Sequence, residues 1–559
     1  MNDNARPSGA AGSGRTKGDV LLEIRDLKIE GESDEVWRPI IKGVDLTLKR
    51  GEVLGLIGES GAGKSTMGLA AMGYARAGCR ISGGGVVFDG IDLLAASIEE
   101  RRRLRGTRIA YVAQSAAASF NPAHQLMDQT IETEMRQGKR SRTEAEKDAI
   151  ELYRRLRLPN PQEIGFRYPH QVSGGQLQRA MTAMAMTCRP DLIIFDEPTT
   201  ALDVTTQVEV LAAIRDIVEQ FHTAAIYITH DLAVVAQMAD RIKVLRYGQS
   251  VEEAPTREML ASPREEYTKS LWSVRKLGKQ EQAAGEAVLQ VKNVTAAYGN
   301  AVRVLADVTV TVPRGRTVAV VGESGSGKST LARVITGLLP PSAGEIVFNG
   351  KVLPPALKDR DAETLRRIQM IYQMPDTALN PRQTVYEVIG RPIEFYRGLT
   401  GAKKEARITE LMNLIEMDDS YVDRFPGELS GGQKQRICIA RALAAEPELI
   451  ICDEVTSALD QIVQEGILQL LMRLQRELNV SYLFITHDIA TVRAISDEIV
   501  VMYQGRVVQQ GPKTQVLSPP HPPYTELLLS SVPEMDPDWL TNLLARRKVQ
   551  PAAMKAGDR

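Results

Sequence analysis

Two glycine-rich segments carry the residue types that hold phosphate groups, and each fits the pattern Gly, four residues, Gly-Lys-Ser. Glycines let backbone N–H groups turn towards phosphate oxygens, while Lys64 and Lys328 add positive charge at the β- and γ-phosphates. The hydroxyls of Ser65 and Ser329 are predicted ligands of Mg²⁺. The predicted loops are Gly58, Glu59, Ser60, Gly61, Ala62, Gly63, Lys64, Ser65 and Thr66, and Gly322, Glu323, Ser324, Gly325, Ser326, Gly327, Lys328, Ser329 and Thr330. The chain is therefore expected to bind two nucleoside triphosphates.

Adjacent carboxylates end two apolar runs, at Asp196-Glu197 and at Asp453-Glu454. An α/β sheet binds ligands at the carboxyl ends of its strands, so the two aspartates can reach the Mg²⁺ shell. The two glutamates can polarise an attacking water as general bases. The simpler alternative is that each acidic pair caps a strand at the surface.

The same motifs occur twice in the same order, which indicates tandem duplication of a whole domain. Lys64 and Lys328 are 264 residues apart (328 − 64), and the later landmarks keep nearly the same offset. The offset is 259 for Gln114 and Gln373, and 257 for Ser173 and Ser430, for Asp196 and Asp453, and for His230 and His487.

Short apolar runs alternate with helical stretches in each half, which predicts an α/β fold with a mostly parallel sheet. The runs at residues 53–57 and 318–321, just before the two loops, are expected to be buried strands. The predicted division is a disordered N-terminal tail at 1–19, a domain at 20–272, a linker at 273–287, a second domain at 288–535 and a loose C-terminal tail at 536–559.

Composition excludes several classes of protein. The 559 residues are 43% hydrophobic and 25% charged, as in ordinary globular proteins, and the net charge of −1 argues against a protein dominated by nucleic-acid binding. The four cysteines form no CxxC pair, which favours a reducing compartment. No stretch approaches the ~20 apolar residues that span a membrane, and residues 1–19 lack the apolar core of a secretory signal.

Two Ser-Gly-Gly-Gln segments complete a set of motifs that resembles the ATP-binding cassette (ABC) ATPases over nearly all residues from 20 to 535. The set also includes Gln114 and Gln373, the Ala-Leu-Asp segments ending at Asp203 and Asp460, and the histidines His230 and His487. The signature segments are Ser173, Gly174, Gly175 and Gln176, and Ser430, Gly431, Gly432 and Gln433. The resemblance implies tandem P-loop NTPase domains, each with a mostly parallel core sheet and a helical signature subdomain.

The resemblance also implies how the sites work. In this family the signature segment of one domain caps the γ-phosphate held by the other, so two composite ATP sites are expected. Glu197 and Glu454 are implied to activate water, and His230 and His487 to contact the γ-phosphate; a satisfied core residue is the alternative for either histidine. The implied Mg²⁺ ligands are Ser65, Gln114, Asp196, Ser329, Gln373 and Asp453. Because both halves keep their lysine and glutamate, two hydrolytic sites are predicted.

The adenine ring commonly stacks on an aromatic side chain upstream of the phosphate loop. Tyr298 occupies a suitable position in the second half, with a packing tyrosine as the alternative. The first half has Gly31 at the aligned position, and Trp37 is a candidate substitute.

Three further segments resemble the oligopeptide, dipeptide and nickel class of importers, whose fused pairs include glutathione and microcin importers. They are the extensions of the glutamine segments at 114–122 and 373–381, and the Ser-Pro-Pro-His-Pro-Pro-Tyr-Thr run at 518–525. The first half keeps only Ser262-Pro263 and Tyr267-Thr268 of that run. No cysteine cluster lies near it, so no iron–sulfur centre is expected.

The resulting hypothesis is an ATPase subunit of a bacterial uptake system. It would lie on the cytoplasmic face of the inner membrane, bound to two transmembrane permease subunits, and a periplasmic or lipid-anchored binding protein would deliver the solute. Peptides are the first candidate solute, with opines, glutathione-like compounds, oligosaccharides and nickel complexes open.

The alternative hypothesis is a soluble ABC protein that acts on ribosomes or nucleic acid. Its best support is the basic run Arg101-Arg102-Arg103-Leu104-Arg105, whose simpler explanation is a solvated helix face just before a strand. No nucleic-acid partner is therefore expected.

Overall fold

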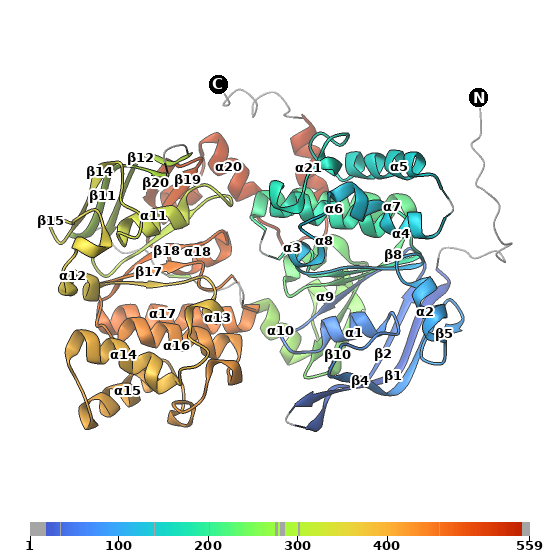
Figure 1. Cartoon of the computed structure of the whole chain (residues 1–559), viewed down its shortest axis with the longest axis horizontal. Helices are drawn as coiled ribbons and strands as arrows, with labels where there is room; N and C mark the ends of the chain where they lie inside the picture. The colour runs from blue at the N-terminus through green and yellow to red at the C-terminus, as the bar shows by residue number, and fades with distance from the viewer. Residues whose placement is uncertain are drawn as a thin grey trace. The chain divides into compact units, whose positions relative to one another are not determined.

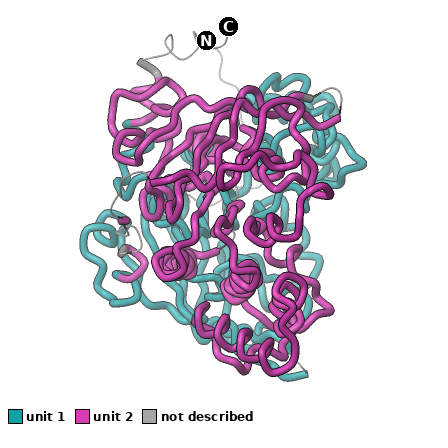
Figure 2. Tube along the Cα trace, turned by 90° about the vertical axis from the view of Figure 1, so that its left-hand side faces the viewer, with its two compact units in different colours: residues 1–200, 209–269, 534–542 teal, residues 201–208, 270–533, 543–559 magenta. Residues whose placement is uncertain are grey.

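The computed structural model describes residues 18–33, 35–138, 140–200, 202–273, 278–279, 285–299, 302–457 and 459–549. The chain forms two compact units, coloured separately in Figure 2. Unit 1 comprises residues 1–200, 209–269 and 534–542, and unit 2 comprises residues 201–208, 270–533 and 543–559. Most of the predicted N-terminal tail (1–17), much of the linker (274–277 and 280–284) and the end of the C-terminal tail (550–559) lie outside the described residues.

The central sheet of unit 1 has the strand order β10-β9-β3-β8-β7-β6 among the described residues. Strands β10 and β8 of this sheet are labelled in Figure 1. Neighbouring strands run parallel except at the edge, where β10 pairs antiparallel with β9. Every residue of β7 and β8 is buried, as expected of parallel strands covered on both faces. The strands are β3 (Val53–Ile57), β6 (Ile109–Val112), β7 (Leu192–Asp196), β8 (Ala224–Ile228), β9 (Arg241–Arg246) and β10 (Gln249–Pro255).

A second, antiparallel sheet in unit 1 has the order β2-β1-β4-β5. Its strands are β1 (Val20–Ser33), β2 (Val36–Lys49), β4 (Cys79–Phe88) and β5 (Ile91–Asp92). Leu22 and Ile24 of β1 share one buried cluster with Leu54 of β3 and Ile194 of β7. The two sheets of unit 1 therefore share a hydrophobic core, to which α1 (Lys64–Ala70) also contributes.

The helices of unit 1 include a group inserted between β6 and β7. These are α3 (Ala116–Ser119), α4 (Leu126–Arg136), α5 (Arg142–Arg155) and α6 (Gly174–Met186). The other helices are α2 (Ile98–Leu104), α7 (Val204–Phe221), α8 (Leu232–Met238), α9 (Thr256–Ala261) and α10 (Glu266–Ser273). The inserted group corresponds to the predicted helical signature subdomain.

Unit 2 repeats both sheets, as the tandem duplication predicts. The central order is β16-β17-β18-β13-β19-β20, and the antiparallel order is β12-β11-β14-β15. The central strands are β13 (Thr317–Val321), β16 (Ile368–Ile371), β17 (Leu449–Asp453), β18 (Ser481–Ile485), β19 (Glu498–Tyr503) and β20 (Arg506–Pro512). The antiparallel strands are β11 (Ala287–Tyr298), β12 (Val302–Pro313), β14 (Ala343–Phe348) and β15 (Lys351–Val352).

The helices of unit 2 follow the same order. They are α11 (Lys328–Ile335), α12 (Ala362–Arg367), α13 (Pro375–Ala378), α14 (Val385–Arg397), α15 (Ala402–Leu414), α16 (Gly431–Leu443), α17 (Gln461–Leu478), α18 (Ile489–Ile495), α19 (Lys513–Leu517) and α20 (Pro523–Ser530). Capping boxes begin α14 at Thr384 and α16 at Ser430, where each side chain accepts a hydrogen bond from the third helical N–H.

The prediction of a loose segment from residue 536 onward is wrong where the structure describes it. Residues 539–549 form a helix, α21 (Trp539–Val549), and Trp539 and Leu540 are buried. Residues 534–542 belong to unit 1, although they follow unit 2 in sequence. The amide of Gln237 holds them: Nε2 donates to the carbonyls of Glu534 (2.8 Å) and Asp536 (2.9 Å), and Oε1 accepts from the N–H of Leu540 (3.0 Å).

The basic run at 101–105 has a structural role. The run lies at the end of α2, four residues before β6, which agrees with the simpler explanation of a helix face just before a strand. Arg101 Nη1 donates to the carbonyl of Gly73 (3.2 Å), and Arg105 Nε donates to that of Met72 (3.0 Å). Two of the four arginines therefore secure the chain after α1. Among the described residues, no helix combines the length and hydropathy that crossing a membrane requires.

Candidate functional site

The two phosphate loops have the same backbone conformation, and glycine is required where they fold most tightly. Gly58 and Gly322 have φ values of 150° and 154°, and a Cβ at either would lie 2.1 Å from a carbonyl oxygen of the neighbouring strand. Gly63 and Gly327, which cap α1 and α11, have φ values of 95° and 103°. Side chains are disfavoured in this left-handed region, so both loops depend on glycine at these points.

The lysine of each loop folds back over it. Lys64 Nζ donates to the carbonyls of Gly58 (2.7 Å) and Glu59 (2.9 Å), and Lys328 Nζ donates to the equivalent carbonyls at 2.8 and 2.7 Å. Both lysines are buried. Burial lowers the pKa of Lys328, and the nearby carboxylates of Glu454 and Asp203 act in the opposite direction.

The serine after each lysine meets the aspartate that ends a central strand. Ser65 Oγ donates to Asp196 Oδ1 (2.8 Å), and Ser329 Oγ donates to Asp453 Oδ1 (3.0 Å). Hydroxyl and carboxylate oxygens are the hard donors that Mg²⁺ prefers, so the residues at both positions fit this ion. Burial, together with the charge of Glu454, raises the pKa of Asp453.

Each glutamate that is predicted to be catalytic lies between a glutamine and a histidine. In unit 1, Gln114 Nε2 donates to Glu197 Oε2 (2.9 Å), and His230 Nδ1 lies 3.3 Å from Glu197 Oε1. The predicted residues from three separate segments of the sequence thus meet at one carboxylate. Glu197 has a φ of 49°, a conformation that is uncommon for a residue with a side chain and is often found at functional positions.

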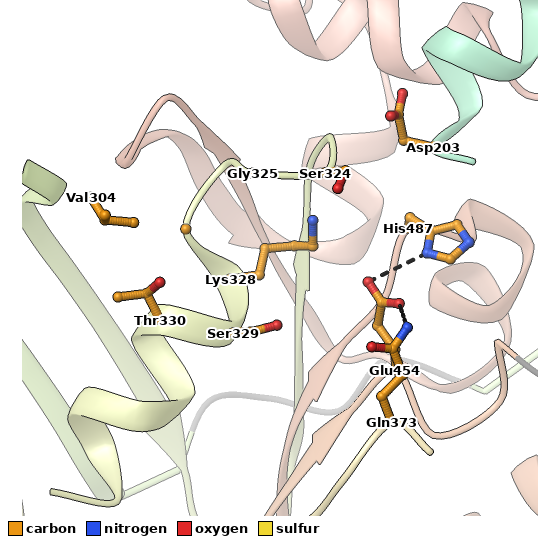
Figure 3. Close-up of a pocket in the computed structure, with 11 residues that line it drawn as sticks. Asp203, Val304, Ser324, Gly325, Lys328, Ser329, Thr330, Gln373, Glu454 and His487 are labelled. Carbon is orange, nitrogen blue, oxygen red and sulfur yellow. Dashed lines mark hydrogen bonds and ion pairs between the residues drawn. The ribbon is translucent and has the colours of Figure 1, made fainter. Parts of the chain in front are cut away.

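Unit 2 has the same constellation. Gln373 Nε2 donates to Glu454 Oε2 (2.7 Å), His487 Nδ1 lies 3.5 Å from Glu454 Oε1, and the φ of Glu454 is 51° (Figure 3). The two units therefore have the same partners around the glutamate and the same uncommon backbone conformation at it.

The glutamate and histidine of each pair shift each other's pKa. Burial raises the pKa of Glu197, but the hydrogen bond and charge of His230, with Lys64, outweigh it and hold that pKa below its ordinary value. Burial lowers the pKa of His230, and Glu197 outweighs it and raises that pKa. The same two directions hold for Glu454 and His487. Each glutamate is therefore kept ionised, as a general base must be.

A cavity of 270 Å³ in unit 2 brings most of the predicted residues together (Figure 3). It is lined by Asp203, Val304, Ser324, Gly325, Gly327, Lys328, Ser329, Thr330, Gln373, Glu454 and His487. Asp203 and Val304 are the members that sequence reasoning did not place in a site. Burial raises the pKa of Asp203, but the hydrogen bonds that it accepts from the side chain of Thr205 and from the backbone and side chain of Thr206 outweigh burial and hold that pKa below its ordinary value.

The signature segments form helix starts rather than ordinary turns. Ser173 caps α6: its Oγ accepts from the N–H of Gln176 (3.3 Å), and Gln176 Oε1 accepts from the N–H of Ser173 (3.1 Å). Ser430 and Gln433 form the same capping box at α16. The helices begin at Gly174 and Gly431, within the signature segments, because the signature itself supplies the cap.

The predicted adenine contacts lie outside this cavity. Tyr298, at the end of β11, is 41% exposed, and its hydroxyl accepts a hydrogen bond from Arg333 Nη1 (2.9 Å). Trp37 lies in β2 under the guanidinium of Arg80, 4.2 Å from the ring centroid, while Gly31 pairs with Arg38 and Cys79. Stacking of adenine on Tyr298 therefore stays a prediction.

Tyr111 also lies at the candidate site of unit 1, although its sequence position did not predict this. Its hydroxyl donates to Asp196 Oδ2, so both oxygens of this carboxylate are engaged. The available signal was a polar hydroxyl in an apolar strand, Ile109–Val112, adjacent to the strand that ends in Asp196.

Comparison with known proteins agrees with this architecture. A family model described as "ABC transporter" matches residues 41–200 and 305–457, and one described as "Oligopeptide/dipeptide transporter, C-terminal region" matches residues 508–558. The chain is 37% identical to the Glutathione import ATP-binding protein GsiA of Escherichia coli K12, over 92% of this chain and 90% of that protein. The protein of the same name from Pectobacterium atrosepticum is 36% identical with the same coverage.

Among solved structures, cbiO1 from Clostridium perfringens, part of the ABC transporter complex cbiONQ, is 31% identical. It covers 41% of this chain and 90% of its own, with a TM-score of 0.38. The duplicated phosphate loops, the paired Glu–His–Gln constellations and the full-length similarity lead to one assignment: the chain belongs to the ABC transporter family, as an ATP hydrolase with two fused ATPase domains and the C-terminal region of oligopeptide/dipeptide transporters.

Proposed function

We propose that this chain energises a bacterial importer by hydrolysing ATP at two Mg²⁺-dependent sites. The observation that carries the proposal is the carboxylate of Glu197 or Glu454, held ionised between a glutamine and a histidine in each unit. A single intact constellation would fit a chain with one active and one regulatory site. Two intact copies favour two hydrolytic sites.

The residues of each site divide the reaction between them. Hydrolysis of a phosphoanhydride depends mainly on positioning and on stabilising charge. Lys64 and Lys328 supply positive charge beside the loop N–H groups. Glu197 and Glu454 accept a proton from the attacking water, and His230 and His487 hold these carboxylates in place. When bound by Ser65 and Asp196, or by Ser329 and Asp453, Mg²⁺ neutralises charge on the phosphates.

The signature segments are proposed to complete the opposite sites. Ser173–Gln176 would join the site of Lys328, and Ser430–Gln433 would join the site of Lys64. Two properties of the segments support this assignment. Each begins a helix of 13 residues, whose N-terminus attracts anions, and Ser173 and Ser430 are exposed.

The proposed partners are two transmembrane permease subunits and, indirectly, a periplasmic or lipid-anchored solute-binding protein. The chain would then lie on the cytoplasmic face of the inner membrane. The match of residues 508–558 to a peptide-transporter region supports peptides as the solute class, and the relatives named for glutathione import make a glutathione-like tripeptide the first solute to test. The domain boundaries proposed from sequence are 20–272 and 288–535.

The ATPase part is tested by phosphate release from purified Glu197→Gln, Glu454→Gln and double variants. Removing a general base slows hydrolysis by about 10²–10⁴-fold, so each single variant should lose at least half of the turnover and the double variant nearly all. Glu132→Gln, an exposed glutamate paired with Arg136 in α4, is the control. Wild-type turnover in either single variant would contradict the presence of two hydrolytic sites.

The import part is tested with the cognate pair of permease subunits, reconstituted in nanodiscs or proteoliposomes. We expect the chain to co-purify with the permeases and to drive uptake of labelled glutathione or short peptides only with hydrolysable ATP. Failure to associate with the permeases would contradict the importer assignment while leaving the ATPase assignment intact.

A further inference from the structure

A tyrosine that follows each central sheet contacts the phosphate loop of the same unit. Tyr267 lies in α10 and Tyr524 in α20. The hydroxyl of Tyr267 accepts a hydrogen bond from the N–H of Glu59 (3.2 Å), and that of Tyr524 accepts one from the N–H of Glu323 (2.9 Å). The two glutamates occupy the same position in their loops, directly after the glycine that begins each one.

The surroundings of the two rings differ although this contact is the same. The guanidinium of Arg246 lies 4.4 Å from the ring centroid of Tyr267, whereas Tyr524 packs against Tyr503 with centroids 4.2 Å apart. If the two rings only filled space, their hydroxyls would not be expected to bond to the N–H of the same loop position in both units. The shared element is the bond from the hydroxyl to the loop.

The same hydroxyl also interacts with the side chain of that glutamate. Burial raises the pKa of Tyr267, and the carboxylate of Glu59 raises it further through its charge and a hydrogen bond. The directions and partners are the same for Tyr524 and Glu323. Each hydroxyl therefore stays protonated and accepts a hydrogen bond from the backbone N–H of the glutamate whose charge acts on it.

Comparison of the two halves of the sequence shows that these tyrosines belong to the part of the run that both halves keep. Of the run Ser518–Thr525, the first half keeps Ser-Pro and Tyr-Thr at residues 262–263 and 267–268 but has no counterpart of His521. Thr268 and Thr525 are fully buried, which fixes the helix that carries each tyrosine. The retained Tyr-Thr pair is thus the part of the run that reaches the nucleotide site.

We infer that Tyr267 and Tyr524 are positioning residues, which set the backbone of the phosphate loop at Glu59 and at Glu323 for binding of the nucleotide. This inference rests on the proposed hydrolysis of ATP and does not depend on import. It connects the C-terminal region matched at residues 508–558 to ATP binding, and it gives Tyr267 the same role outside that match.

The test is a double variant, Tyr267→Phe with Tyr524→Phe, in the full-length chain, so that both sites change while both rings stay. Losing, at each site, one part-buried hydrogen bond that shapes a binding loop should raise the KM for ATP about five- to tenfold and change kcat less than twofold. The affinity for ATP measured by calorimetry should fall by a similar factor.

The matched control is Tyr153→Phe with Tyr482→Phe. These hydroxyls are more deeply buried than those of Tyr267 and Tyr524, and they bond to Thr130 and to the carbonyl of Leu471, away from the loops. The inference holds if only the first double variant raises the KM while both double variants melt within a few degrees of each other. It is overturned if the KM of the first double variant matches that of the control. Absence of ATP hydrolysis in the unmodified chain would instead contradict the proposed function.

Discussion

The hydroxyl of Tyr111 donates to Asp196, and no equivalent donor exists at the matching position of unit 2. Tyr111 pairs with Ile194, two residues before Asp196, whereas Met370 pairs with Ile451, two residues before Asp453. A thioether has no O–H to donate. Asp196 and Asp453, the aspartates that fit Mg²⁺ in the two units, therefore accept hydrogen bonds from different sets of side chains.

This difference predicts unequal Mg²⁺ affinities. Groups that hydrogen-bond a metal-binding carboxylate commonly contribute 10–100-fold to affinity. The Glu454→Gln background removes the proposed general base of unit 2, so that the remaining turnover reports on unit 1. In this background, Tyr111→Met should raise the Mg²⁺ concentration for half-maximal turnover about tenfold.

The reciprocal variant is the control for this prediction. Met370→Tyr in a Glu197→Gln background should lower the Mg²⁺ requirement of the other site. An unchanged Mg²⁺ titration in both variants would show that the hydroxyl of Tyr111 does not support the ion.

The pair of Glu454 and His487 predicts a pH-dependent contribution to stability. The pKa of His487 is raised in the folded chain, so its contribution is complete below the unfolded value of about 6.5 and is lost as pH rises through the folded value. The pKa of Glu454 is lowered, so its contribution is complete above about 4.3 and is lost only as pH falls through the folded value. Between about pH 4.3 and pH 6.5, the pair of Glu454 and His487 therefore makes its full contribution to the stability of the folded chain.

Melting curves in EDTA should show this window. The Tm of wild type should exceed that of His487→Gln by a few degrees at pH 6, since 1 kcal/mol shifts the Tm by roughly 2–4 °C in domains of this size. The difference should shrink steadily towards pH 9. A difference that is constant from pH 6 to pH 9 would mean that the charge of His487 does not matter.

The buried side chain of Leu540 predicts that the end of the chain stabilises unit 1. Leu540 is 0% exposed, and its N–H is bonded to Gln237. Leu540→Ala should cost about 2–5 kcal/mol and lower the melting transition of unit 1. Leu478→Ala, at a leucine that is 46% exposed, should leave both transitions nearly unchanged.

Two variants of Tyr298 distinguish stacking of its ring on adenine from the hydrogen bond between its hydroxyl and Arg333. If adenine stacks on the ring, Tyr298→Ala should raise the KM for ATP about two- to tenfold, as expected for an aromatic contact, and Tyr298→Phe should not. If the hydroxyl bond to Arg333 is what matters, both variants should show the same effect. Initial-rate kinetics distinguish these outcomes.

The sequence was most informative where one local pattern determines one local structure. The run Val53–Ile57 became β3 with the predicted bounds, and Ser173–Gln176 became a helix start. The meeting of Gln114, Glu197 and His230 could be expected because the family resemblance ordered them around one γ-phosphate.

Contacts between segments far apart in the chain were not accessible from such patterns. Nothing in residues 536–549 indicates that Gln237 would hold their backbone, because the amide acts on carbonyls that any sequence possesses. Tyr267 was noticed only as the remnant of a motif, since its partner is a backbone N–H 208 residues away. Backbone partners of this kind have no sequence signature.

The inclusion of residues 534–542 in unit 1 affects how the chain is made. At about 5–20 residues per second, a ribosome needs roughly 15–55 s to add the residues between 269 and 542. Throughout that interval the first half lacks residues 534–542, which bond to Gln237 and include the buried Leu540 in the finished chain. The nascent first half should therefore bind chaperones until synthesis is nearly finished, and a gene fragment that encodes residues 20–272 alone should yield a protein that aggregates.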